Sequence, residues 1–184
     1  MKSTLGVGRR ITAGFLSTGA ALSIAAVFLI VFVNSVRRYI LGKSFEWGEE
    51  LPIYLAVYGV MFGSALAYLQ DRHVRFMVVV NFLPRRVCHV LFLVVDLAMV
   101  CIGAGLTRSG YLFMAKRGDI EASGIIGPAN WLKALSGIDA IETLGFMAPY
   151  QAAMVLGGVL VTVAAALKFL ERITGGGMQP GGSG

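Results

Sequence analysis

The sequence predicts an all-α membrane protein with four transmembrane helices, and three observations predict it. Hydrophobic residues make up 57% of the 184 residues and charged residues only 14%, whereas a typical soluble domain has about 45–50% and about 25%. The mean hydropathy is +0.75. Four apolar stretches also reach the length of about 20 residues that a bilayer core requires. This composition excludes a disordered chain, a nucleic-acid-binding domain and an ordinary soluble enzyme, so no nucleic acid is expected as a partner.

The four predicted spans are the stretches that lie between charged residues. They cover residues 11–36, 51–70, 87–107 and 143–167, which are 26, 20, 21 and 25 residues long, and Asp96 interrupts the third. The first stretch is longer than the about 7–15 apolar residues of a signal peptide, so it is expected to be an uncleaved helix. Residues 1–174 are predicted to form a single four-helix membrane domain. Residues 175–184 are predicted to be a flexible Gly-rich tail, whose final Gly-Gly-Ser-Gly is typical of an artificial linker.

Two segments between the predicted spans carry apolar residues of their own. Residues 76–83 lie between the second and third spans and are too short to cross a bilayer, so a short interfacial segment is expected there. Between the third and fourth spans, Trp131, Leu135, Ile138 and Ile141 recur at helical spacing. This pattern predicts an amphipathic helix. It fits a helix on the membrane surface with Trp131 as its anchor, and it fits a partner-binding surface equally well.

The positions of Lys and Arg indicate the orientation of the chain, because cytoplasmic segments carry an excess of both. Nine of them lie in the N-terminus, in the segment between the second and third spans, and in the C-terminus, which includes Lys168 and Arg172. Seven lie in the two remaining segments. Both termini are therefore expected to be cytoplasmic. The net charge of +6 is therefore explained by the basic residues that flank the spans, and it does not indicate a nucleic-acid partner.

The densest group of polar side chains joins the first span to the second. Arg37 and Arg38 follow the first span, and Trp47, Glu49 and Glu50 precede the second. Acidic residues in a first helical turn are favoured by the helix dipole, and Trp suits the headgroup level. The group fits a salt-bridged hairpin, with the arginines paired to the glutamates, and it fits a docking site for a partner equally well. No nucleophile or metal ligand lies near it in the sequence, so neither an enzyme nor a metal site is predicted.

Asp96 and two glycines are the other candidate site residues within the spans. A carboxylate inside a bilayer costs about 2.5–3.5 kcal/mol on insertion scales, so Asp96 is expected to face protein and to have a partner. An ion or proton site is one interpretation, but a buried hydrogen bond between helices is favoured because the other spans offer few polar groups. Gly59 and Gly63 form a GxxxG step, which predicts close helix packing. His73 and His89 lie near span ends and do not form the pairs that a di-haem site needs, so no cofactor is expected in this chain.

Several short motifs follow one another in a specific order. They are Arg38-Tyr39, Trp47-Gly48-Glu49-Glu50, Gly63-Ser64-Ala65-Leu66-Ala67, Asp71-Arg72-His73 and Leu83-Pro84-Arg85-Arg86. In this order the chain resembles the small membrane subunit, the DctQ- or SiaQ-type Q subunit, of TRAP (tripartite ATP-independent periplasmic) transporters. The resemblance runs from about Ile11 to Leu167 and includes all four spans.

The resemblance implies a role and a set of partners. In this family a periplasmic binding protein captures an organic anion, and a large elevator-type membrane subunit carries it inward with sodium ions. The small subunit braces the large subunit and helps to dock the binding protein, so both proteins and the membrane lipids are the implied partners. A sodium site would belong to the large subunit. The resemblance also implies a bacterial inner membrane with both termini in the cytoplasm.

An autonomous, oligomeric four-helix channel or carrier is the alternative hypothesis, with Asp96 as its ion or proton site. Secondary transporters usually contain internal repeats and broken helices. Neither is evident in this sequence, so the scaffold interpretation is preferred.

Overall fold

The computed structural model describes residues 2–70 and 84–174. Within these ranges the chain forms four long helices, α1 (Lys2–Leu41), α2 (Trp47–Leu69), α4 (Arg85–Arg117) and α6 (Ala148–Ile173). All four are long and apolar enough to cross a membrane. The described residues contain no β-strand and only one isolated bridge, between Glu121 and Phe146. The predicted fold class is confirmed, and the protein is an all-α, multi-pass membrane protein.

Most of the helices are longer than the apolar stretches that predicted them. α1 continues past two arginines to Leu41, and α4 continues past Thr107 to Arg117. Lys and Arg have high helix propensity, so a charge ends an apolar span without ending the helix. The predicted start of the fourth span at Thr143 is wrong, because α6 begins at Ala148. Pro149 lies in the first turn of α6, where its missing N–H costs no hydrogen bond.

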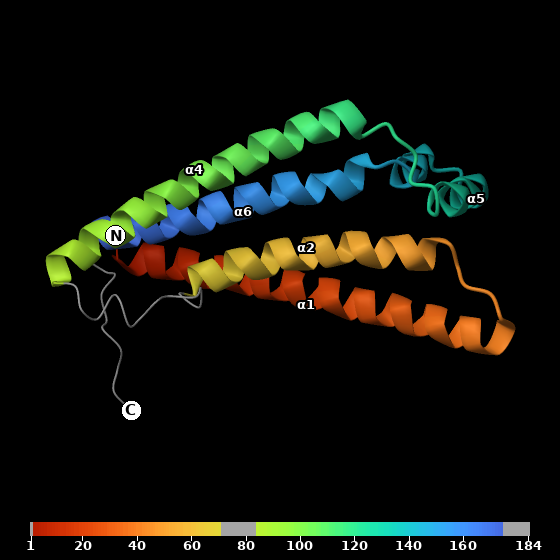
Figure 1. Ribbon diagram of the computed structural model, residues 1–184, viewed down its shortest axis with the longest axis horizontal. Coiled ribbons are helices and arrows are strands. Elements are labelled where there is room, and N and C mark those ends of the chain that lie inside the picture. The colour runs from red at the N-terminus through yellow and green to blue at the C-terminus, as the bar shows by residue number, and fades with distance from the viewer. Residues whose placement is uncertain (1, 71–83, 175–184) are drawn as a thin grey trace.

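The four helices lie side by side in the order α1, α2, α6, α4 and form a row rather than a closed bundle (Figure 1). α2 packs against α1 on one side and against α6 on the other, and α4 packs against α6. The main cluster of buried side chains lies between three of the helices and includes Leu16 of α1, Leu69 of α2 and Leu160 of α6. The outer helices α1 and α4 keep many large apolar side chains exposed, among them Phe28 and Val94.

Small residues allow α4 and α6 to approach closely. A Cβ atom added at Gly158 of α6 would lie 2.5 Å from the backbone nitrogen of Thr107 on α4. A Cβ added at Gly103 of α4 would lie 2.9 Å from the backbone nitrogen of Thr162 on α6. Real Cβ atoms do not approach backbone this closely, so both positions require glycine. Membrane helices commonly associate through such small residues, because lipid supplies no hydrophobic drive for their packing.

The connection between α4 and α6 contains two short helices. α5 (Ile126–Ser136) is followed by the 3-10 helix η1 (Asp139–Gly145). Gly137 separates them with a φ of 68°, a left-handed conformation that ends α5. The helix predicted between the third and fourth spans is present as α5, but Ile138 and Ile141 lie outside it, so it is shorter than the apolar pattern indicated. The predicted interfacial segment at residues 76–83 lies outside the described residues.

Candidate functional site

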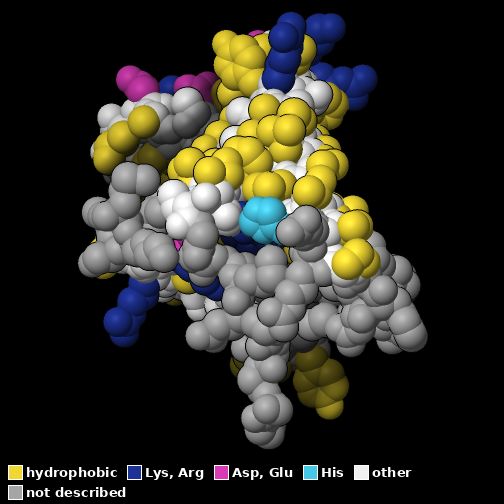
Figure 2. All heavy atoms as spheres, turned by 90° about the vertical axis from the view of Figure 1, so that its left-hand side faces the viewer, with side chains coloured by type: hydrophobic (Ala, Val, Ile, Leu, Met, Phe, Trp, Pro, Cys, Tyr) yellow, Lys and Arg dark blue, Asp and Glu magenta, His cyan; other side chains and the backbone are white. Residues whose placement is uncertain are grey.

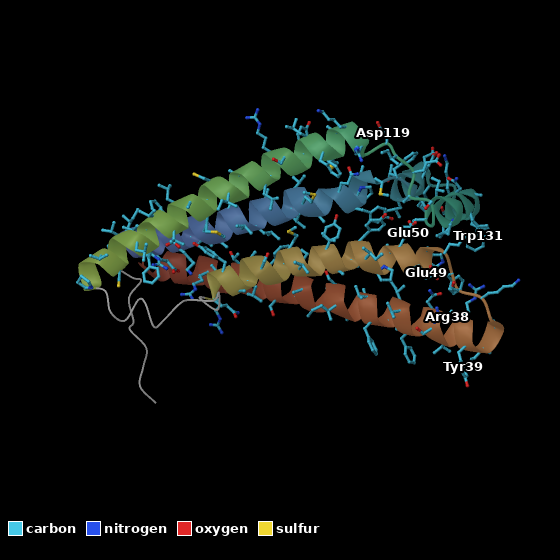
Figure 3. All side chains as sticks on the ribbon, in the orientation of Figure 1. Arg38, Tyr39, Glu49, Glu50, Asp119 and Trp131 are labelled. Atoms are coloured by element: carbon cyan, nitrogen blue, oxygen red, sulfur yellow. The ribbon has the colours of Figure 1, made fainter. Side chains whose placement is uncertain are left out.

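Two groups of polar residues lie at opposite ends of the row of helices, and Figure 3 labels Glu49, Glu50 and Trp131 at the α5 end. The α5 end carries the turn between α1 and α2 together with α5 and η1. The N-terminal end carries the starts of α1 and α4. Viewed from the N-terminal end, the upper part of the molecule, where α4 lies in Figure 1, shows mainly hydrophobic side chains, with Lys and Arg gathered at its upper margin (Figure 2).

Asn34 organises the turn at the α5 end. The backbone N–H of Phe45 donates a hydrogen bond of 2.7 Å to Oδ1 of Asn34, which is 9% exposed. A Cβ at Gly48 would lie 2.7 Å from Cγ of Asn34, so the glycine allows α2 to pack on this side chain. Asn34 was not among the candidate residues that the sequence indicated. Its position shortly before a turn is the signal that indicates a role in closing the turn.

The expected ion pairs between arginines and glutamates do not form in this turn. The Arg37 guanidinium instead lies over the Phe45 ring at 3.5 Å from its centroid, and the Phe45 and Trp47 rings are 5.1 Å apart. Glu49 accepts a hydrogen bond of 2.9 Å from the Ser44 hydroxyl. Within residues 2–70 and 84–174, no carboxylate forms an ion pair with Arg37, Arg38 or Lys43. The salt-bridged form of the hairpin prediction is therefore wrong, since the turn is closed by Asn34 and by ring contacts.

Glu50 connects α2 to the segment that follows α4. The Ser123 hydroxyl donates a hydrogen bond of 2.8 Å to Oε1 of Glu50. A Cβ at Gly124 would lie 3.0 Å from the carbonyl oxygen of Glu46, so the two segments are in close contact. The second carboxylate oxygen, Oε2, is buried and has no hydrogen-bond partner among the described residues. Glu50 thus joins two parts of the same chain.

Three tyrosines continue this connection toward α6. The Tyr54 and Tyr150 rings stack with centroids 4.3 Å apart. The Tyr58 hydroxyl donates to the carbonyl of Pro149, and the Tyr150 hydroxyl donates to the carbonyl of Leu144 at 2.7 Å. Sequence reasoning missed these residues, although Glu50, Tyr54 and Tyr58 recur at the four-residue spacing that places them on one helix face.

Asp96 lies at the centre of a buried polar cluster near the N-terminal end. It is 1% exposed. The Tyr68 hydroxyl donates to its Oδ1 at 2.5 Å, and Nε of Arg172 lies 2.6 Å from its Oδ2. The carboxylate therefore faces protein and has partners on both α2 and α6, as the sequence predicts. The Asp96 charge is thus paired with the Arg172 guanidinium, and the carboxylate links α4 to α2 and α6.

Lys168 and Arg172, which the sequence places in the C-terminal flank, both belong to this cluster. Lys168 is buried within α6 and donates to the Tyr68 carbonyl at 2.9 Å. Arg9 of α1 donates to the Leu69 carbonyl at 3.3 Å. These carbonyls end α2, where the negative end of the helix dipole favours cations. The Arg172 side chain is only 10% exposed, because α6 continues to Ile173 and carries both cations against its neighbours.

The remaining candidate residues have different surroundings. A Cβ at Gly59 would lie 3.3 Å from Cβ of Ser23 on α1, whereas a Cβ at Gly63 would meet no atom within 4 Å. Trp131 is 65% exposed on α5. Lys133 of α5 donates to Glu142 at 2.5 Å. Lys133 also lies 3.2 Å from the Asp139 carboxylate. The hydrogen bonds to Glu142 and Asp139 raise the pKa of Lys133.

Within the described ranges, no three His, Cys, Asp or Glu side chains lie together in a way that would hold a metal ion. Both candidate groups contain hydrogen bonds, ion pairs and ring contacts. These interactions hold helices and connecting segments of this chain against one another.

Comparison with known proteins identifies the family. Residues 27–175 match the model of the DctQ component of the tripartite ATP-independent periplasmic transporters. The chain is also 31% identical over 77 residues to a protein of Haemophilus influenzae named as a TRAP transporter small permease protein. That match covers 42% of this chain and 48% of the relative, so the chain spans about half the length of the curated relative it matches. Because the family model matches more than half of the chain, this four-helix protein belongs to the DctQ family of TRAP transporter components, which is a transporter family and not an enzyme family.

Proposed function

We propose that this chain is the small scaffold subunit of a TRAP transporter in a bacterial inner membrane, with both termini in the cytoplasm. It braces the large elevator-type membrane subunit and helps to dock the periplasmic binding protein. The large subunit carries the organic anion and its sodium ions. The observation that carries the proposal is the arrangement of the described helices in a row, which leaves large apolar side chains on the flanks of α1 and α4 exposed for other partners.

The surroundings of Asp96 support bracing over transport. The channel or carrier hypothesis requires that the translocated ion or proton reach Asp96, but Asp96 is 1% exposed and is paired with Arg172 and Tyr68. A buried carboxylate that is already compensated gains little from a second cation. The surroundings of Asp96 therefore do not support the channel or carrier hypothesis.

The α5 end supports a docking role for the binding protein. With the termini in the cytoplasm, this end faces the periplasm. It presents the exposed Trp131, Leu135 and Asp119, and Trp is common at the centre of protein interfaces. Glu50 and Ser123 hold the segment after α4 on α2, so both parts of the docking face have one fixed position.

Isolation of the chain from native membranes tests the proposal. We expect solubilisation in a mild detergent to yield one large polytopic protein at about a one-to-one ratio. Single cysteines that replace Phe28 on α1 and Val94 on α4 then report, by cross-linking, which flank contacts it. A homo-oligomer without such a partner would contradict the proposal. Ion flux through liposomes containing this chain alone, abolished by Asp96→Asn, would establish the channel hypothesis in its place.

A further inference from the structure

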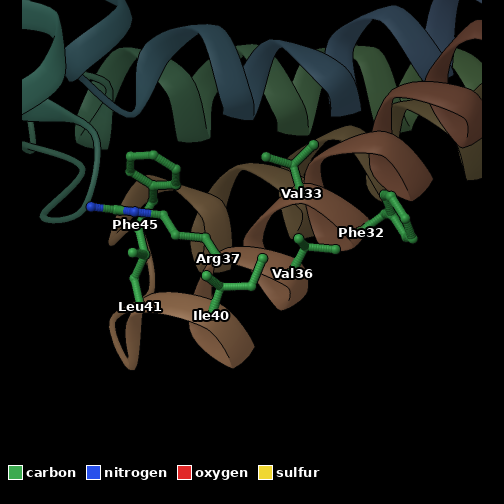
Figure 4. Close-up of a pocket in the computed structure, with 7 residues that line it drawn as sticks. All are labelled: Phe32, Val33, Val36, Arg37, Ile40, Leu41 and Phe45. Atoms are coloured by element: carbon green, nitrogen blue, oxygen red, sulfur yellow. The ribbon is translucent and has the colours of Figure 1, made fainter.

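An open apolar groove lies at the end of α1 nearest to α5 (Figure 4). Its volume is about 320 Å³. The residues that line it are Phe32, Val33, Val36, Arg37, Ile40, Leu41 and Phe45. Apart from the Arg37 guanidinium, which lies over the Phe45 ring at its edge, these side chains are apolar. The groove thus combines a hydrocarbon-like surface with a cation at one side.

Some of the described cations form an ion pair with a described carboxylate, and others, such as Arg10, Arg108 and Lys116, form none. Arg9, Lys133 and Arg172 each have a carboxylate within 4.0 Å. Arg37 and its neighbours Arg38 and Lys43 form no ion pair with any described carboxylate, and Arg38 and Lys43 are exposed. Among the described residues, these three positive charges therefore have no carboxylate partner and can face an anion from outside.

The groove also lies at a particular level along α1. Val36 ends the long apolar run of the helix, and Arg37 is the first charge after it. Helical residues rise about 1.5 Å each, so the groove extends roughly 13 Å along the helix axis, from Phe32 to Leu41. Its first part lies beside the apolar run, at the level of lipid chains, and its second part lies at the level of lipid headgroups. Arginine side chains near helix ends commonly extend to this level.

We propose that the groove binds an acyl chain of an anionic phospholipid whose phosphate contacts Arg37. Arg38 and Lys43 supply further positive charge beside the headgroup, which attracts an anionic phosphate. The ring contact with Phe45 holds the Arg37 guanidinium at the edge of the groove. The apolar lining favours a lipid over a free phosphate, and the unpaired cations favour an anionic lipid over a zwitterionic one.

Native mass spectrometry of the purified full chain tests the site. The chain in mild detergent is titrated with phosphatidylglycerol or with phosphatidylcholine that has the same acyl chains. We expect at least fivefold more phosphatidylglycerol to be retained. Arg37→Gln should bring the two lipids close to parity. Val36→Phe fills the groove without changing a charge and should lower the retention of phosphatidylglycerol at least threefold. Lys116→Gln, at an exposed cation outside the groove at the same end of the molecule, should change neither.

Several outcomes would overturn the proposal. Equal retention of both lipids by the unmodified chain would do so, as would equal losses in Arg37→Gln and Lys116→Gln. Competition by glycerol 3-phosphate as strong as that by phosphatidylglycerol would show a phosphate site that does not need the groove. Helical content measured by circular dichroism checks that each variant folds. If Arg37→Gln does not fold, Val36→Phe still tests the groove. Because the experiment uses this chain alone, its result is independent of the proposed scaffold function. If the large partner displaced the lipid on co-isolation, the groove would instead be a protein contact.

Discussion

Asp96 shows how a residue that is costly in a membrane is stabilised by partners on other helices. Its carboxylate contacts the Tyr68 hydroxyl from α2 and the Arg172 guanidinium from α6. A buried ion pair stabilises little relative to apolar residues of the same size, but removal of one partner leaves an uncompensated charge. Asp96 and Arg172 are therefore expected to depend on each other.

Arg172→Leu is predicted to destabilise the protein by about 3–5 kcal/mol, because it leaves the Asp96 charge buried without its cation. Tyr68→Phe removes one hydrogen bond to a charged group and is expected to cost about 1.5–3 kcal/mol. The free energy of unfolding in detergent micelles, measured with increasing denaturant, checks both values.

Two controls accompany this prediction. Arg9→Gln breaks an ion pair with Glu171 in which the arginine side chain is 43% exposed, so it should cost only about 0–1 kcal/mol. The double variant Asp96→Leu/Arg172→Leu removes both charges and should recover most of the loss. A double variant as unstable as Arg172→Leu would show that the unpaired charge is not the cause.

At the scale of elements, close contacts between helices determine which glycines are required. Gly158 faces the α4 backbone, whereas a Cβ at Gly105 of α4 would meet no atom within 4 Å. Both glycines lie inside long helices, where glycine is intrinsically less favourable than alanine. Their different surroundings therefore separate packing from helix propensity.

Gly158→Ala is predicted to lower the stability by about 1–3 kcal/mol, the usual cost of overpacking a tight contact. Gly105→Ala, its matched control, should be neutral or stabilising by up to about 1 kcal/mol. Thermal unfolding of both variants in detergent measures the difference. Equal effects would mean that the α4–α6 contact tolerates an extra methyl group.

At the scale of the whole molecule, one set of contacts at each end of the row joins the hairpin of α1 and α2 to the hairpin of α4 and α6. At the N-terminal end the contacts are made by the Asp96 cluster. At the α5 end they are made by Glu50 with Ser123 and by Tyr54 with Tyr150. These contacts join the two hairpins into one unit, which is the property that the proposed bracing function needs.

Glu50→Gln or Trp47→Ala is predicted to lower organic-anion uptake severalfold in cells that express all the transporter components, with no change in substrate preference. The physical reason is that both residues shape the α5 end, whereas the proposal assigns the substrate site to the large subunit. Uptake of a labelled anion against a panel of unlabelled competitors measures rate and preference together. Ser123→Ala leaves the Glu50 charge in place and reports the contribution of the internal hydrogen bond alone. An altered competitor profile would place part of the specificity in this chain.

Much of the fold is predictable from the sequence, but less of the site is. Apolar composition and the length of the runs predicted four spans, and the cost of a buried carboxylate predicted that Asp96 has a partner. The break at Gly137 was missed because the recurrence of apolar residues continues across it. Ion pairs were expected for Arg37 and Arg38 because opposite charges lie close in the sequence, but Arg37 lies over the Phe45 ring and neither arginine pairs with a described carboxylate. Contact with a partner protein remains a prediction for four of the site residues, Arg37, Arg38, Trp47 and Trp131.

The sequence by itself determined that the chain has four stretches long and apolar enough to cross a membrane, because a bilayer requires about 20 consecutive apolar residues, but it did not determine where each helix begins and ends. The tertiary structure alone decided which side chains meet. Tyr68 lies 28 residues before Asp96 and 100 residues before Lys168, yet all three meet at one level of the row. Local spacing specifies only the faces of one helix, whereas contacts between helices depend on how the helices rotate and pack against each other.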